Sequence, residues 1–118
     1  MKTTPTFIPL TPAVFHILLA LSDGDKHGYR IMQTAQAQSG GRLRMGAGTL
    51  YGSIKRMLTD GLIEEAGERP DPAMDDERRR YYHITEHGRK ALQAEADRIA
   101  FLAGQLKSLH LIGNRHEG

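Results

Sequence analysis

The N-terminal third of the chain carries apolar residues at the spacing of helices. A first helix is predicted after Thr11-Pro12, because threonine caps a helix start and proline needs no N–H in the first turn. Its apolar positions are Val14, Ile17, Leu18 and Leu21, and the turn 22–25 ends it. A second helix is predicted over 27–38. Its expected buried face is Gly28, Ile31, Met32 and Ala35. A glycine on that face indicates close packing against the first helix.

The next apolar stripe predicts a third helix over 47–60. Its expected buried positions are Leu50, Ile54, Met57 and Leu58. Off this stripe lie Thr49, Ser53, Lys55 and Arg56, with Tyr51 beside it. Exposed helix faces commonly mix both signs of charge, whereas this one has no acid before Asp60. Gly61 stands where a left-handed helix cap is expected.

Two short segments after the third helix are typical of strands. The segment 80–84 is rich in aromatic and β-branched residues, and 62–65 is its expected partner. Between them, 66–79 holds two prolines and many charges and is predicted to be a long hairpin loop. Two short strands that follow three helices indicate a wing.

The last segment is predicted to be one long helix over 86–112. Leucine and isoleucine recur every seven residues in two registers, and alanines flank them. The residues of this seam are Leu92, Ala96, Ile99, Leu102, Ala103, Leu106 and Leu109. A helix of that length spans roughly 40 Å, more than a small three-helix core can cover. We therefore expect a partner helix from a second copy of the chain. The alternative is a helix that folds back on its own domain.

Together these elements predict a mainly α fold with a small β-wing. We expect a winged helix-turn-helix domain over 11–85 and a long C-terminal dimerisation helix over 86–112. Residues 1–10 form an N-terminal arm and residues 113–118 a frayed tail.

Charge is unevenly distributed along the 118 residues, although the net charge is only +2. No acid occurs between Asp25 and Asp60, a span that holds six cations: Lys26, Arg30, Arg42, Arg44, Lys55 and Arg56. Such a span favours a positive face that attracts nucleic acid, with an unevenly charged solvated surface as the alternative. The chain has no cysteine, which excludes disulfides and favours a reducing compartment, the cytoplasm. Its start, MKTTPTFIPL, is not a signal peptide, and no apolar run is long enough for a membrane span.

His83-Ile84-Thr85-Glu86-His87 matches the H-x-x-E-H pattern of one class of zinc protease. That site needs both histidines on one helix face. Here His83 falls in the predicted strand, Thr85 is placed to cap the next helix, and His87 falls in that helix's first turn. We therefore expect no metal, no other cofactor and no enzyme activity.

Five blocks of sequence, in this order and spacing, resemble the PadR family of bacterial transcriptional regulators. They are ILLAL at 17–21, HGYRI at 27–31, GTLY at 48–51, LTDGLI at 58–63 and RYYHITEHG at 80–88. The resemblance implies a homodimeric repressor that binds a palindromic operator in double-stranded DNA and releases it when a small, often aromatic effector binds. Gly52 and Ser53 depart from the proline and alanine common in that family. An acidic wing tip, 75–77, argues against deep minor-groove insertion.

In a helix-turn-helix the second helix of the pair enters the major groove, which assigns that role to 47–60. The expected DNA-binding residues are Tyr29, Arg42, Gly48, Thr49, Tyr51, Ser53, Lys55, Arg56, Arg78, Arg79 and Arg80. Tyr29 and Tyr51 either contact DNA or pack the domain. An effector is expected between the long helices and the first helix, where Phe15 and Phe101 are candidates beside ordinary packing. The rival function is a winged-helix module that binds protein and no DNA.

Overall fold

The computed structural model describes residues 8–70 and 78–113. Three helices form the core: α1 (Pro12–Leu21), α2 (Gly28–Gln38) and α3 (Ala47–Thr59). Three strands form one antiparallel sheet in the order β1-β3-β2, with β1 at Lys26–His27, β2 at Ile63–Pro70 and β3 at Arg78–Ile84. The long helix α4 runs from Glu86 to Ser108. These elements confirm the predicted mainly α fold with a β-wing and a long final helix.

Side chains cap the helices where the sequence predicts them. Thr11 accepts a hydrogen bond from the Val14 N–H at 3.2 Å, and Thr85 accepts one from Gly88 at 3.0 Å. His27 caps α2, because its Nδ1 accepts from the Arg30 N–H at 3.2 Å. Gly61 ends α3 with a φ of 77°, the left-handed conformation expected of it.

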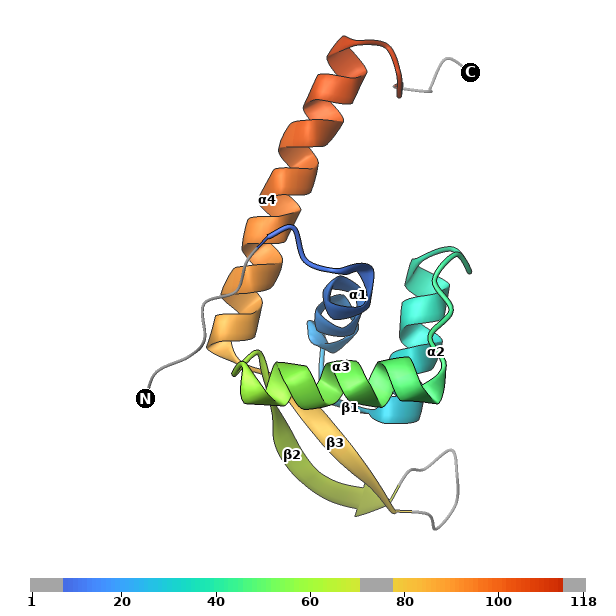
Figure 1. The fold of residues 1–118 in the computed structure, drawn as a ribbon, viewed down its shortest axis with the longest axis vertical. Helices are drawn as coiled ribbons and strands as arrows, with labels where there is room; N and C mark the ends of the chain where they lie inside the picture. The colour runs from blue at the N-terminus through green and yellow to red at the C-terminus, as the bar shows by residue number, and fades with distance from the viewer. Residues whose placement is uncertain (1–7, 71–77, 114–118) are drawn as a thin grey trace.

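The core lies where α1, α2 and α3 meet the sheet. Its fully buried large side chains are Ile17, Leu18, Leu21, Ile31, Leu50, Met57, Leu62, Ile63 and Ile84. Leu10 also joins the core, so the predicted arm is packed where it meets α1. In Figure 1, α4 runs away from this core, and the β2–β3 hairpin projects at the opposite end of the molecule.

The structure corrects several predicted boundaries. The strand β1 was not predicted, since two residues are too short for a pattern. The hairpin strands extend well beyond 62–65 and 80–84, into the predicted loop 66–79, while 71–77 lie outside the described residues. The sequence pattern missed the outer part of the strands because the register shifts between Glu65 and Glu68. Gly67, with a φ of 94°, interrupts the alternation of side chains there.

Two further predictions need correction. Helix α4 ends at Ser108 rather than at 112, because His110 turns left-handed with a φ of 62° and the Leu111 N–H closes on the Leu106 carbonyl at 2.9 Å. At about 1.5 Å per residue, α4 is therefore roughly 35 Å long. Gly28 is buried as expected, but its close neighbour is Tyr51 of α3 rather than α1.

Candidate nucleic-acid interface

Helix α3 presents one polar face to solvent. Gly48, Thr49, Tyr51, Lys55 and Arg56 are all exposed. Leu50, Ile54 and Met57 face the core, which gives the helix its two sides. The N-cap, Gly46, makes no side-chain hydrogen bond, and the first turn holds no acid. The positive end of the helix dipole is therefore not neutralised by an acidic side chain of that turn.

Ser53 is not on this face. It is only 8% exposed, three residues after the fully buried Leu50 and one before Ile54. The burial of Ser53 does not support its predicted contact with DNA, which stays a prediction. A serine among apolar core positions was taken for part of the polar face.

Two tyrosines, one on α3 and one on α2, are about half exposed. Tyr29 in the first turn of α2 is 43% exposed, and Tyr51 is 48% exposed. The ring of Tyr51 covers Gly28, where an added Cβ would lie 2.8 Å from the tyrosine Cζ. Tyr51 therefore both packs two helices together and keeps an edge in solvent.

Exposed cations lie on α2 and on the connection that leads into α3. Arg42, in the connection before α3, is exposed as predicted. Arg30 and Arg44 are exposed as well, although neither was singled out as a contact residue. The signal for them was the acid-free span between Asp25 and Asp60, which holds all three. Helix α2, the connection and α3 thus add cations from one continuous piece of chain.

The three arginines at the base of the wing, Arg78, Arg79 and Arg80, differ in their surroundings. Arg80 is exposed, and its guanidinium lies 3.6 Å from Glu65 and 3.5 Å from Glu68. Arg79 is half buried, and the side chain of Arg78 lies outside the described residues, as does the acidic tip 75–77. The predicted wing contacts therefore rest on Arg79 and Arg80, of which Arg80 already faces carboxylates. Tyr82 is buried, and the ring of Tyr81 lies edge-on against His27, so both stabilise the wing.

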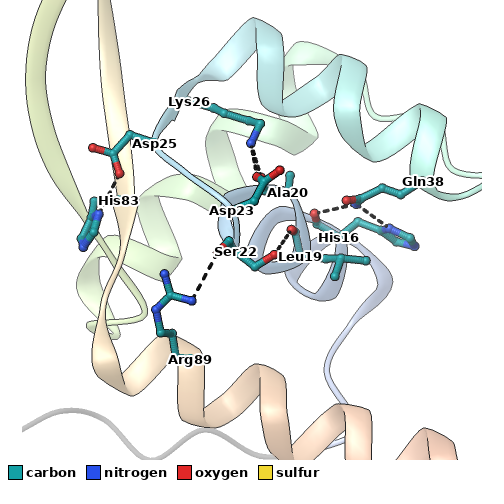
Figure 2. A network of polar contacts seen from close by, with 10 residues as sticks. All are labelled: His16, Leu19, Ala20, Ser22, Asp23, Asp25, Lys26, Gln38, His83 and Arg89. Carbon is teal, nitrogen blue, oxygen red and sulfur yellow. Dashed lines mark hydrogen bonds and ion pairs between the residues drawn. The ribbon is translucent and has the colours of Figure 1, made fainter.

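Polar contacts join the turn after α1 to the sheet and to α4 (Figure 2). Lys26 Nζ donates to the Ala20 carbonyl and to Asp23, both at 2.6 Å, and holds the pKa of the Asp23 carboxyl below its usual value. His83 Nδ1 pairs with Asp25 Oδ1 at 2.7 Å. Arg89 donates to the Ser22 carbonyl at 3.3 Å. The turn is therefore held from two sides.

The structure also shows where the two histidines of the H-x-x-E-H pattern lie. His83 lies in β3 and contacts Asp25, whereas His87 lies in the first turn of α4, as predicted. The two imidazoles therefore belong to different elements. Within residues 8–70 and 78–113, no three His, Asp or Glu side chains are grouped in a way that could hold a metal ion.

The apolar seam of α4 lies largely in solvent. Its exposed large side chains are Ile99 at 41%, Leu102 at 42%, Leu106 at 39% and Leu109 at 66%. Ala96 is exposed too, while Leu92 and Ala103 are half buried. The buried positions of α4 are Gly88, Ala91 and Glu95, all in its first half. A row of apolar side chains of this length is not covered by the chain's own domain.

An open hollow of about 340 Å³ lies between α1 and α4. It is lined by Phe15, Leu19, Arg89, Leu92, Gln93 and Ala96. The structure therefore places Phe15 in the predicted location. Phe101 does not line this hollow and is 67% exposed further along α4, so its role in a pocket stays a prediction.

The described part of the chain has no helix that is both long and apolar enough to span a membrane. The sequence profile of the transcriptional regulator PadR-like family matches residues 17–94. A 37.1 kDa protein of a Streptomyces fradiae transposon is 37% identical over 90 residues, which are 76% of this chain and 24% of that protein. The chain thus spans about a quarter of the length of that relative.

Solved structures share the fold at low identity. A Streptococcus mutans protein matches with a TM-score of 0.70 at 23% identity, covering 95% of this chain and 100% of that one. A PadR family regulator from Clostridium difficile matches with a TM-score of 0.67 at 24% identity, covering 82% and 96%. Bacillus subtilis PadR in complex with operator DNA matches with a TM-score of 0.58 at 20% identity, covering 69% and 44%.

Proposed function

The chain belongs to the PadR-like family of transcriptional regulators, and from this premise we propose that it is a homodimeric repressor that binds a palindromic operator. Helix α3 enters the major groove in this proposal, and the half-exposed tyrosines and flanking arginines contact the backbone on either side. The fold that the chain shares with a PadR bound to operator DNA supports this mode of binding.

One observation carries the proposal: the exposed face of α3 holds hydrogen-bonding and cationic side chains and no acid. Thr49 lies near the N-terminus of the helix, where a short side chain can reach a base edge or a phosphate. Lys55 and Arg56 lie further along, where they suit the phosphate backbone. An α3 surface for protein partners would need no such exclusion of negative charge.

The exposed seam of α4 supports the dimer. Two copies that pair through Ile99, Leu102 and Leu106 would remove these side chains from water, which is favourable at about 25 cal/mol per Å² of apolar surface. Pairing would also give the two copies of α3 a twofold relationship. Binding to an inverted repeat follows from that symmetry.

We also assign effector binding to the hollow between α1 and α4. Phe15, Leu19 and Leu92 offer it apolar walls, and Arg89 and Gln93 offer polar groups. A small aromatic molecule there would lie between the DNA-binding domain and the dimerisation helix. It would release DNA if it bound the DNA-free dimer more tightly than the DNA-bound one.

The proposal is tested by titrating the purified protein onto its own upstream intergenic DNA, with random duplex as competitor and at several salt concentrations. A complex of two chains on an inverted repeat that resists the competitor is the expected result. A shift that random duplex abolishes would leave only a basic surface. The rival function, a protein-binding winged helix, would then be the better account.

A further inference from the structure

The wing holds one arginine between two carboxylates. Arg80 Nη1 lies 3.6 Å from Glu65 Oε2, and Arg80 Nη2 lies 3.5 Å from Glu68 Oε2. Glu68 is the direct cross-strand partner of Arg80, whereas Glu65 is paired with Tyr82. The register shift between the two glutamates, with Gly67 left-handed, is where the strand bends and brings both carboxylates to one guanidinium.

Arg80 lies on the face of the sheet that is turned towards the helical core. Successive side chains of a strand point to opposite faces, so Arg80 shares its face with Tyr82 and Ile84, both of which are buried. Burial raises the pKa of Tyr82, while the charge of Arg80 lowers it and the phenol of Tyr51 raises it. Arg80 and Tyr51 are thus both close enough to act on the same tyrosine.

Two carboxylates face the one guanidinium of Arg80. All three side chains are about half exposed, at 53% for Arg80, 51% for Glu65 and 54% for Glu68. Exposed ion pairs of this kind contribute little to stability and are easily exchanged. A DNA phosphate can therefore replace the glutamates at Arg80, but it must compete with both of them for the guanidinium.

We propose that Glu65 and Glu68 hold Arg80 in the DNA-free protein and lower its affinity for any DNA backbone, so that stable binding depends on the contacts of α3 with the bases. This inference rests on the proposed function and adds a determinant of the overall affinity for the DNA backbone to it. The two glutamates act as positioning residues, because they act on DNA through Arg80.

The test compares the E65Q/E68Q variant with the natural chain on upstream DNA and on random duplex. Removal of two charges near the backbone is expected to raise the affinity for random duplex roughly fivefold at low salt. The release of Arg80 should steepen the dependence on salt by about one phosphate contact. The ratio of specific to random affinity should stay unchanged, because both affinities gain the same backbone contact.

Two matched variants give the experiment its control. Glu64 lies on the same strand as Glu65 but on the other face, opposite His83, so E64Q makes the same charge change away from Arg80. We expect E64Q to leave random binding close to that of the natural chain, whereas E65Q alone raises it. In an R80Q background, E65Q/E68Q should no longer strengthen binding.

Three results would overturn the inference: unchanged random binding by E65Q/E68Q, an equal gain from E64Q, or a gain that persists in the R80Q background. Each of them leaves the proposed function intact as long as the natural chain binds its upstream DNA. Failure of the natural chain to bind either DNA would instead overturn the proposed function together with the inference.

Discussion

Gly28 and Tyr51 meet where α2 and α3 cross, and the phenol ring occupies the space that any side chain at position 28 would need. An added Cβ would lie 2.8 Å from Cζ of Tyr51 and closer still to its hydroxyl. The close contact joins the first turn of α2 to the exposed face of the helix assigned to DNA.

The substitution Gly28→Ala should therefore weaken DNA binding. The blocking atoms are the far end of a flexible side chain, so Tyr51 will rotate away while the fold is kept. We expect several-fold weaker operator binding in a fluorescence anisotropy titration, with the unfolding midpoint within a few degrees of the natural chain. Gly104→Ala is the control, since nothing lies within 4 Å of its added Cβ. Operator affinity as high as that of the natural chain would contradict a positional role for the contact.

Gly88 behaves differently, because its neighbours are rigid. An added Cβ would collide with the Leu62 carbonyl oxygen and lie 2.9 Å from Cγ1 of Ile84. Backbone atoms cannot rotate away, so Gly88→Ala should lower the free energy of unfolding by the amount typical of overpacking, about 1–3 kcal/mol. Gly104→Ala should instead raise it slightly, because alanine favours a helix by up to about 1 kcal/mol. Calorimetric melting of both variants checks the difference in sign.

Replacing both Lys55 and Arg56 by alanine should weaken binding to every DNA sequence. Each lost phosphate contact reduces the magnitude of the slope of log affinity against log salt by about 0.9. Loss of both contacts should therefore reduce that magnitude by roughly 1.8. Lys107→Ala removes a cation near the far end of α4 and should leave the slope unchanged. If the double variant keeps the natural affinity and slope, these residues do not touch DNA.

The seam of α4 can be tested with two neighbouring apolar residues. Leu102 lies about 60° from Ile99 round the helix, whereas Phe101 lies roughly 160° away on the opposite face. Leu102→Glu should therefore convert the dimer into monomers in sedimentation velocity, and Phe101→Glu should leave it intact. The reverse pattern would move the interface to the other side of α4.

Glu95 should make folding sensitive to acid. It is 3% exposed and binds Arg98 through two hydrogen bonds of 2.9 and 2.8 Å, and that guanidinium holds its pKa below the ordinary value of 4.5. A lowered folded pKa stabilises the fold above 4.5, and this contribution is lost as pH falls through the folded pKa.

Glu95→Gln should accordingly lower the unfolding midpoint by a few degrees at neutral pH. The difference from the natural chain should narrow as the pH is lowered from 7 to 3, because the natural carboxyl also loses its charge as the pH falls through its lowered pKa. Glu86→Gln, at an 84% exposed position with a 3.9 Å ion pair, should change little at either pH. A constant difference between pH 7 and 3 would show that the Glu95 charge does not stabilise the fold.

The sequence predicted the helices well because local chemistry sets their ends. Thr11, Thr85 and Gly61 each cap a helix as their residue types suggest. The outer half of the hairpin was missed because the left-handed Gly67 interrupts the alternation. Beyond it, Glu68 and Arg80 have no apolar pattern, and their pairing is visible only in three dimensions.

The candidate site was predicted in outline and not in every residue. Leu50, Ser53, Ile54 and Met57 follow the spacing of a buried helix face, so the burial of Ser53 had a signal in the sequence that its polarity obscured. The contact of Tyr51 with Gly28 had no such signal. It depends on the angle between α2 and α3, which a linear pattern does not specify.

No loop separates the wing from α4. Strand β3 ends at Ile84, α4 begins at Glu86, and Thr85 between them hydrogen bonds through its hydroxyl to Gly61, Leu62 and Gly88. The wing and α4 are thus joined directly at Thr85, so that a change in the direction of one element is passed to the other. In the proposed dimer, a tilt of α4 would therefore reach the wing through Thr85, and the end of α3 through the bond from Thr85 to Gly61.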